Sequence, residues 1–186
     1  MAVSPDLTKV YVTGTSHSDY TTLAYRARTG ARLWVQRHGD HHDFATSMAV
    51  TPGGIVLVTG TSRTNTSGWD FVTIAYNATG TQLWAQRYNG TGNGDEVAPS
   101  VAASSNGRVY VTGTSWGASP TGDDFATIAY NVRTGAQVWV RRYNSPATAG
   151  CCDHAKALAA RGGRVFVTGS VLATTGEDYA TIAYNG

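Results

Sequence analysis

The sequence predicts an all-β fold, a β-propeller built from four-stranded antiparallel blades. The first reason is a motif, Asp-aromatic-x-Thr-x-Ala-Tyr, that recurs four times with steps of 51, 54 and 54 residues between its aspartates. A fixed step of this size indicates an array of one structural unit. The second reason is composition: only 14% of the residues are charged, and 22 are glycine, which is typical of sheets covered on both faces. The four copies occupy residues 19–25, 70–76, 124–130 and 178–184.

Each unit contains four short apolar runs bounded by turn residues, and we name the expected strands A to D in chain order. Strand A is the run after an acidic loop, such as residues 47–50. Strand B ends in Val-Thr-Gly at residues 12–14, 58–60, 111–113 and 167–169. Strand C carries the recurring motif, and strand D carries a Trp four residues after a Thr-Gly turn. These tryptophans are Trp34, Trp84 and Trp139.

Strand C distinguishes a propeller from the other arrays. Alternation places Phe71 and Ala75 on one face and Ile74 and Tyr76 on the other, so both faces are apolar. A β-sandwich strand would present one polar face, and the repeats of an open solenoid are shorter. A meander that is apolar on both sides is expected to pack between two neighbouring blades.

The predicted organisation is one propeller array over residues 1–186, with approximate units at 1–42, 43–94, 95–152 and 153–186. The first unit lacks most of strand A and the last lacks strand D, which leaves about 3.5–4 blades. We therefore expect an incomplete propeller. It is either a fragment of a longer product or a half that pairs with a second copy into a ring of seven to eight blades.

Several classes of function are disfavoured by the sequence. The net charge is +2 and the basic residues are scattered, so no nucleic-acid footprint is present. No apolar run reaches the length of a membrane span, and the first residues do not form a signal peptide. The two cysteines, Cys151 and Cys152, are adjacent, from which we expect no disulfide framework.

The repeats resemble a known family. The pattern Val-Tyr-Val-Thr-Gly, Asp-Tyr-x-Thr-Ile-Ala-Tyr-Asn and Thr-Gly-x-x-x-Trp-x-x-Arg-Tyr resembles the bacterial β-propeller repeats of secreted and cell-surface proteins. Residues 27–34, 78–84 and 132–139 are similar to the tryptophan-docking element of pyrroloquinoline-quinone-type, quinoprotein-like propellers. The resemblance implies tryptophans that pack blade against blade, and an extracellular or periplasmic location. In some members it also implies a quinone cofactor.

Residues that occur once per blade are interpreted as structural, because a catalytic residue would be unique. This interpretation covers the three repeated tryptophans and the arginines three residues after them. It also covers the aspartate that opens each strand C. These residues are Arg37, Arg87, Arg142, Asp19, Asp70, Asp124 and Asp178.

Function is expected where the repeat fails, on the face formed by the B–C and D–A loops, since these loops vary while the A–B and C–D turns do not. Three groups on this face are candidate ligand-binding residues. His41, His42 and Asp43 have the chemistry of a metal-ligand set, and Cys151, Cys152, Asp153 and His154 form a second set or an activated thiolate. Trp69 and Trp116 suit stacking on a sugar or a protein hot spot. The alternatives are solvated histidines, incidental thiols and tryptophans folded over their own blades.

We interpret the chain as a non-catalytic scaffold that binds a protein or carbohydrate ligand and needs no cofactor. No Gly-x-Ser-x-Gly, His-Glu-x-x-His or phosphate-binding glycine loop is present. Two enzymatic alternatives stay open. One is part of a quinoprotein-like oxidoreductase holding pyrroloquinoline quinone with calcium. The other is a metal-dependent hydrolase or lyase that uses His41, His42 and Asp43.

Overall fold

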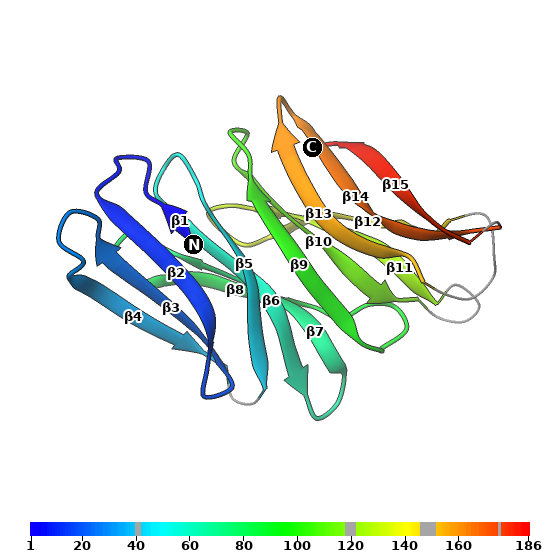
Figure 1. Ribbon diagram of the computed structural model, residues 1–186, viewed down its shortest axis with the longest axis horizontal. Coiled ribbons are helices and arrows are strands. Elements are labelled where there is room, and N and C mark those ends of the chain that lie inside the picture. Colours follow the sequence, from blue (N-terminus) through cyan, green and yellow to red (C-terminus); the bar gives the residue numbers. More distant parts are fainter. Residues whose placement is uncertain (40–41, 118–121, 146–151, 175) are drawn as a thin grey trace.

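The computed structural model is an array of four twisted antiparallel sheets, arranged side by side in chain order (Figure 1). It describes residues 1–39, 42–117, 122–145, 152–174 and 176–186. The elements in these ranges are all strands. Within these ranges, no helix has the length and apolar character needed to cross a membrane. The predicted all-β propeller is confirmed.

Every sheet is a meander whose hydrogen-bonded neighbours follow the chain. Sheet 1 contains β1 (Ala2–Val3), β2 (Lys9–Ser16), β3 (Asp19–Arg26) and β4 (Arg32–His38). Sheet 2 contains β5 (Asp43–Val50), β6 (Val56–Thr64), β7 (Gly68–Tyr76) and β8 (Gln82–Tyr88). Sheet 3 contains β9 (Glu96–Ala103), β10 (Arg108–Trp116), β11 (Asp123–Asn131) and β12 (Gln137–Tyr143). Sheet 4 contains β13 (His154–Arg161), β14 (Arg164–Ala173) and β15 (Gly176–Asn185). We call these sheets blades 1 to 4.

The recurring threonines pair inside each blade. The threonine of Val-Thr-Gly lies opposite the threonine of strand C, and their hydroxyl oxygens are 3.1 Å apart for Thr59 and Thr73 and 3.0 Å apart for Thr112 and Thr127. The strand B hydroxyl also donates to a strand C carbonyl, at 3.1 Å from Thr59 to Val72. A polar residue is therefore tolerated in the middle of a buried strand because its hydroxyl is satisfied.

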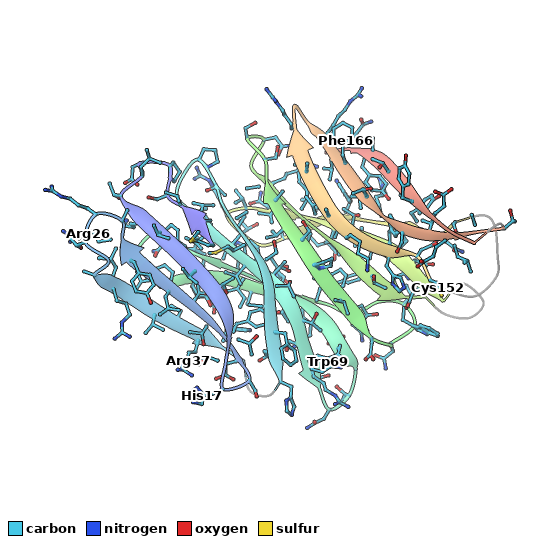
Figure 2. All side chains as sticks on the ribbon, viewed as in Figure 1. His17, Arg26, Arg37, Trp69, Cys152 and Phe166 are labelled. Carbon is cyan, nitrogen blue, oxygen red and sulfur yellow. The ribbon has the colours of Figure 1, made fainter. Side chains whose placement is uncertain are left out.

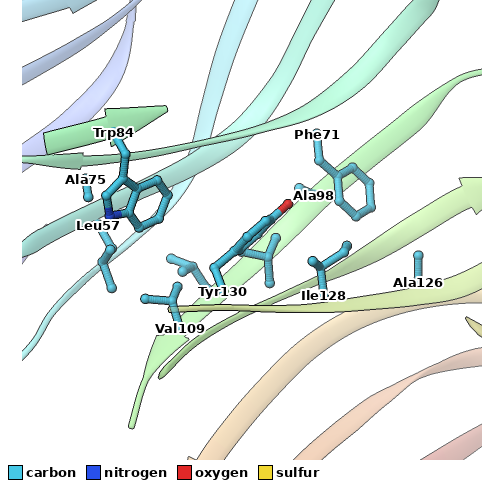
Figure 3. Close-up of a cluster of buried hydrophobic side chains, with 11 residues drawn as sticks. Leu57, Phe71, Ala75, Trp84, Ala98, Val109, Ala126, Ile128 and Tyr130 are labelled. Atoms are coloured by element: carbon cyan, nitrogen blue, oxygen red, sulfur yellow. The ribbon is translucent and has the colours of Figure 1, made fainter. Parts of the chain in front are cut away.

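The core lies between blades. Figure 3 shows the cluster between blades 2 and 3, where Leu57, Phe71 and Trp84 of blade 2 face Ala98, Val109, Ile128 and Tyr130 of blade 3. Ile74, on the opposite face of the same β7, belongs to the cluster with blade 1. Strand C therefore packs on both faces, as its alternation indicates.

In blades 1 and 2 the tryptophan lies on the C–D turn of the next blade. Trp84 Nε1 donates to the carbonyl of Val132 at 2.9 Å, and Trp34 Nε1 donates to that of Ala78 at 3.3 Å. A β-carbon at Gly135, where φ is +71°, would lie 2.8 Å from the Trp84 ring. Glycine is needed there for two reasons, the left-handed backbone and the close approach of the indole.

Candidate functional site

The B–C and D–A connections lie together at one edge of the array, which we call the loop face. In Figure 1 this is the lower edge, while the β5–β6, β9–β10 and β13–β14 turns lie at the upper one. Backbone hydrogen bonds join the two kinds of connection. The N–H of Asp43 donates to Ser18 O at 2.7 Å, and that of Asp153 donates to Asp123 O at 3.0 Å. The starts of blades 2 and 4 are thus bonded to the B–C connection of the blade before.

A buried carboxylate opens strand A in blades 2, 3 and 4. These groups are Asp43, Glu96 and Asp153. Strand pairing makes the first two equivalent, because Asp43 lies opposite Ser62 and Glu96 lies opposite Ser115. In blade 3 the buried acid is Glu96 and not the adjacent Asp95. Asp95 instead accepts a hydrogen bond from the N–H of Trp69 at 3.2 Å.

Asp43 and Asp153 were candidate ligand-binding residues, but the structure places both inside the array. Asp153 accepts the N–H groups of Ser145 at 2.5 Å and of Leu172 at 3.1 Å. A β-carbon at Gly39, the residue after β4, would collide with the Asp43 carboxylate. Asp153 therefore anchors the D–A connection from within, and neither carboxylate is exposed.

Glu96 has a strongly perturbed carboxyl group. Burial raises its pKa from the ordinary 4.5 to about 8, and the nearby carboxylate of Asp70 raises it further. The N–H of Gly90, the hydroxyl of Ser115 and the charge of Arg142 lower the pKa in part. Glu96 is accordingly protonated near neutral pH, which suits a carboxyl group with little solvent around it.

In blades 2 and 3 the repeated arginine of strand D reaches across its own blade. Arg87 Nη1 donates to Asp70 Oδ2 at 2.8 Å and to Ser62 O at 3.1 Å, and its Nη2 donates to Ser62 Oγ at 2.7 Å. Arg142 bonds Asp124 and Ser115 in the same way. Each guanidinium therefore ties strands D, C and B together. In blade 4, where the described residues hold three strands, Asp178 is exposed.

The described members of the two histidine-containing sets do not gather at one site. His41 and Cys151 lie outside the described residues. His42 is exposed, and its carbonyl accepts the N–H of Arg63. His154 Nδ1 is 3.3 Å from Thr114 Oγ1 and 3.9 Å from Asp123 Oδ2. In the part of the chain that the structure describes, no three His, Cys, Asp or Glu side chains gather as a metal site.

Cys152 corrects the sequence expectation about the cysteines. It is disulfide-bonded, so its sulfur is not a thiolate nucleophile.

The two loop-face tryptophans lie in different surroundings. Trp69 packs on Phe44 with ring centroids 5.4 Å apart, and the guanidinium carbon of Arg63 lies 5.7 Å from its ring centroid. Trp116 is 42% exposed. A β-carbon at Gly94 would lie 2.6 Å from its ring, so the glycine-rich D–A connection covers one side of it. Trp69 and Arg37 both lie toward the loop face (Figure 2).

A basic groove runs along the loop face at the junction of blades 1 and 2. At the next junction, Tyr88 and Trp116 occupy the positions of His38 and Arg63 in strand register. The sequence analysis missed this groove because its residues come from three separate strand ends. The groove is lined by Arg37, His38, Gly39, Ser62, Arg63, Thr64, Asn65 and Arg87.

Comparison with known proteins agrees with this architecture. A family model described as outer membrane protein assembly factor BamB, of the PQQ-like repeat type, matches residues 18–183. The chain belongs to this family. No curated protein matches the BamB-family chain in sequence.

Solved structures share the fold of this BamB-family chain. A europium-containing methanol dehydrogenase superposes with a TM-score of 0.53 at 19% identity, over 75% of this chain and 24% of that one. Quinohemoprotein alcohol dehydrogenase from Comamonas testosteroni gives a TM-score of 0.52 at 16% identity, over 96% of this chain and 34% of that one. The chain thus spans between a quarter and about a third of the length of these dehydrogenases.

Pyrroloquinoline quinone with calcium is the cofactor that the resemblance implies, and the described residues do not fit it. Calcium takes six to eight oxygen ligands, whereas three of the buried carboxylates are already bonded to other groups. Asp70 is bonded to Arg87, Asp124 to Arg142, and Asp153 to backbone N–H groups. The ring of Trp34 packs between Tyr11 and Tyr76, at 5.8 and 6.1 Å, and so is committed to blade packing.

Proposed function

We propose that this chain is a non-catalytic scaffold that binds a protein or a glycan through its loop face. The observation that carries the proposal is the basic groove between blades 1 and 2. The side chains of this groove differ from those at the junction of blades 2 and 3, where Tyr88 and Trp116 stand at the positions of His38 and Arg63. Variable side chains on a rigid scaffold are the usual basis of binding specificity.

The charges of the groove favour an acidic partner. Among the described residues, the arginine ion pairs are Arg87 with Asp70 and Arg142 with Asp124. Arg37 and Arg63 therefore carry no carboxylate partner within those ranges and are exposed. Guanidinium groups bind carboxylate, sulfate and phosphate groups through paired hydrogen bonds.

The aromatic pair beside the groove adds a second kind of contact. Trp69 is held by Phe44 and by Arg63, which itself lines the groove. An indole fixed in this way offers a stacking surface at low entropic cost. The combination of cation and ring suits an acidic sugar, or a peptide with acidic and apolar residues.

The family supports a role in binding. Its description as an outer membrane protein assembly factor implies contact with other proteins, and an extracellular or periplasmic location is part of this proposal. The quinoprotein alternative rests on fold similarity to two dehydrogenases at 19% and 16% identity, a level that supports the fold and not the chemistry. No observation favours the hydrolase alternative.

Isothermal titration with polygalacturonate, poly-glutamate and neutral dextran tests the proposal. We expect binding to an acidic polymer that weakens with added salt, and no binding to dextran. The double variant Arg37→Ala/Arg63→Ala should lose at least tenfold in affinity. The matched control, Arg28→Ala/Arg133→Ala, removes the same charge from exposed C–D turns at the opposite edge and should bind like the parent. Equal losses in the two variants, or no binding to either acidic polymer, would count against the groove.

A further inference from the structure

A second hollow lies directly beside the basic groove of the loop face. The two share a wall, since Arg63, Thr64 and Asn65 line both of them. Their volumes are about 370 Å³ for the second hollow and about 420 Å³ for the groove, each within the range of about 300–1,000 Å³ that is usual for small-ligand sites. The groove and the second hollow are therefore two compartments of one cleft. The second hollow is lined by His42, Arg63, Thr64, Asn65, Thr66 and Gly68.

A chain of hydrogen bonds holds the β6–β7 connection, which forms the wall between the compartments. Thr64 Oγ1 accepts the N–H groups of Thr66 at 3.3 Å and of Ser67 at 2.9 Å. Ser67 Oγ donates to Asp70 Oδ2 at 2.6 Å, and the same oxygen accepts Arg87 Nη1 at 2.8 Å. The wall is thus fixed without a ligand, which lowers the entropic cost of binding one.

The far end of this connection is anchored by Asp95. Its Oδ1 accepts the N–H of Trp69 at 3.2 Å. A β-carbon at Gly68, where φ is +72°, would lie 2.8 Å from the same oxygen. Glycine therefore lets the chain pass this close to the carboxylate. Residues 64–69 are held at both ends, so the side chains that line the second hollow have a fixed base.

The polar lining of the second hollow suits a sugar better than a peptide side chain. Its described lining residues carry hydroxyl, amide, imidazole and guanidinium groups and no apolar side chain. An apolar peptide side chain would find no partner there. The hydroxyl groups of a sugar can both donate to and accept from Asn65 and Thr66, because an amide and a hydroxyl each offer donors and acceptors.

Arg63 is placed to bind an acidic group in either compartment. Its side chain is exposed, and its guanidinium carbon lies 5.7 Å from the centroid of the Trp69 ring. The ion pairs among the described residues do not include it. In blade 3 the same register position holds Trp116, so the fold of a blade does not require a cation there. A guanidinium group that is free of carboxylates can bind a carboxylate or sulfate group of a ligand.

We propose that this cleft binds an acidic oligosaccharide of at least two sugar units, with one unit in the groove and the next in the second hollow. Arg63 binds a carboxylate or sulfate group of the ligand, while Asn65 and Thr66 pair with hydroxyl groups of the second unit. The inference rests on the proposed function, because it takes the loop face as the binding surface. It goes further by choosing a glycan over a protein and by assigning one sugar to each compartment.

Calorimetric titration of the chain with galacturonate, digalacturonate and tetragalacturonate is the first test. We expect at least a tenfold gain in affinity from the single sugar to the dimer, because the dimer fills both compartments. Tetraglutamate has the same number of carboxylates as tetragalacturonate and no sugar hydroxyl groups, so it should bind more weakly. Equal affinity for the single sugar and the dimer, or tighter binding of tetraglutamate than of tetragalacturonate, would overturn the inference.

A double variant tests the second hollow by itself. His42→Ala/Thr66→Ala removes two exposed side chains that line the second hollow and not the groove. This variant should bind galacturonate like the parent and lose the gain for digalacturonate. The matched control is His17→Ala/Thr29→Ala, which removes the same residue types from exposed positions that line neither compartment. The control should keep the gain, and an equal loss in both variants would overturn the inference.

The outcomes separate this inference from the proposed function. Suppose that the parent binds polygalacturonate and Arg37→Ala/Arg63→Ala does not, but the dimer binds no better than the single sugar. The groove then stands as the binding site, and the two-compartment cleft is overturned. Binding of poly-glutamate without binding of any galacturonate would support a protein partner and overturn the glycan. Absence of binding to both acidic polymers would remove both proposals.

Discussion

Arg142 donates two hydrogen bonds to one carboxylate oxygen of Asp124, from Nε at 3.1 Å and from Nη2 at 2.8 Å. The same guanidinium donates to Ser115 Oγ at 2.7 Å and to the hydroxyl of Tyr88 at 3.3 Å, in the preceding blade. One side chain thus neutralises a buried acid, bridges three strands and reaches across a blade junction. The ion pair of Arg142 with Asp124 therefore also helps to hold blades 2 and 3 together.

Removal of this side chain should be costly. Arg142→Ala would leave the buried Asp124 carboxylate without its cation, and we expect the free energy of unfolding to fall by about 2–4 kcal/mol. Arg141→Ala is the control, because Arg141 is exposed, packs over the Trp139 ring and donates to the carbonyl of the neighbouring Val140, so its loss should stay under about 1 kcal/mol. Urea unfolding followed by tryptophan fluorescence would measure both, and comparable losses would contradict this account.

Two glycines allow the need for a left-handed backbone to be separated from the need for space beside an indole ring. Gly135 and Gly107 both have positive φ, at +71° and +79°, but only Gly135 lies against an indole. Gly107→Ala should cost about 1 kcal/mol through backbone strain alone. Gly135→Ala should cost about 2–4 kcal/mol, because the Trp84 ring must also shift. If thermal unfolding showed the same loss for both, the indole contact would not be a determinant of stability.

The threonine hydroxyl pairs inside the blades should stabilise the fold more where they are more deeply buried. Thr73 is fully buried opposite Thr59, whereas Thr181 is paired in the same way with Thr168 at 3.0 Å but lies on the outer blade and is exposed. Thr73→Val should therefore lower the free energy of unfolding by about 1 kcal/mol and Thr181→Val by less than about 0.5 kcal/mol. Chemical denaturation of the two valine variants would test this order, and a larger loss in Thr181→Val would reverse it.

The fold was predictable because its signals are local and repeated. The spacing of the motif and the two-faced alternation of residues 70–76 are properties of the chain itself, and each blade expresses them in the same way. The position of a single side chain was less predictable. Asp95 and Glu96 are adjacent acids, and only the pairing of Glu96 with Ser115 decides which one turns inward.

The candidate site was harder to predict, because it is assembled between blades. Arg37, Arg63 and Arg87 are far apart in sequence and meet only when β4, β6 and β8 end at one edge. Arg37 and Arg87 also recur once per blade, so the sequence favoured a structural interpretation and gave no sign that they line a groove. Residues 41–43 were predicted as a ligand set because two histidines and an aspartate are adjacent in the sequence. In the structure, Asp43 begins β5 with its side chain buried.

The stability of the chain should fall as the pH rises, because of Glu96. Its pKa is about 8 in the folded chain and is expected near the ordinary 4.5 when unfolded. Between these values the folded chain holds a proton that the unfolded chain has lost, so the free energy of unfolding decreases with pH over that window. The decrease is at most about 1.4 kcal/mol per pH unit for one group. Burial also raises the pKa of Asp43 and Asp124, which adds to the same trend.

Glu96→Gln isolates this contribution. Glutamine keeps the shape and the hydrogen-bonding capacity of the protonated acid but cannot ionise beside Asp70. We expect the variant to match the parent near pH 5 and to be more stable than the parent at pH 8.5, with a smaller slope between them. Urea unfolding at pH 5, 7 and 8.5 would measure the two slopes. Equal slopes would mean that Glu96 is ionised in the folded chain, and that Arg142 and the N–H of Gly90 outweigh the cost of its burial.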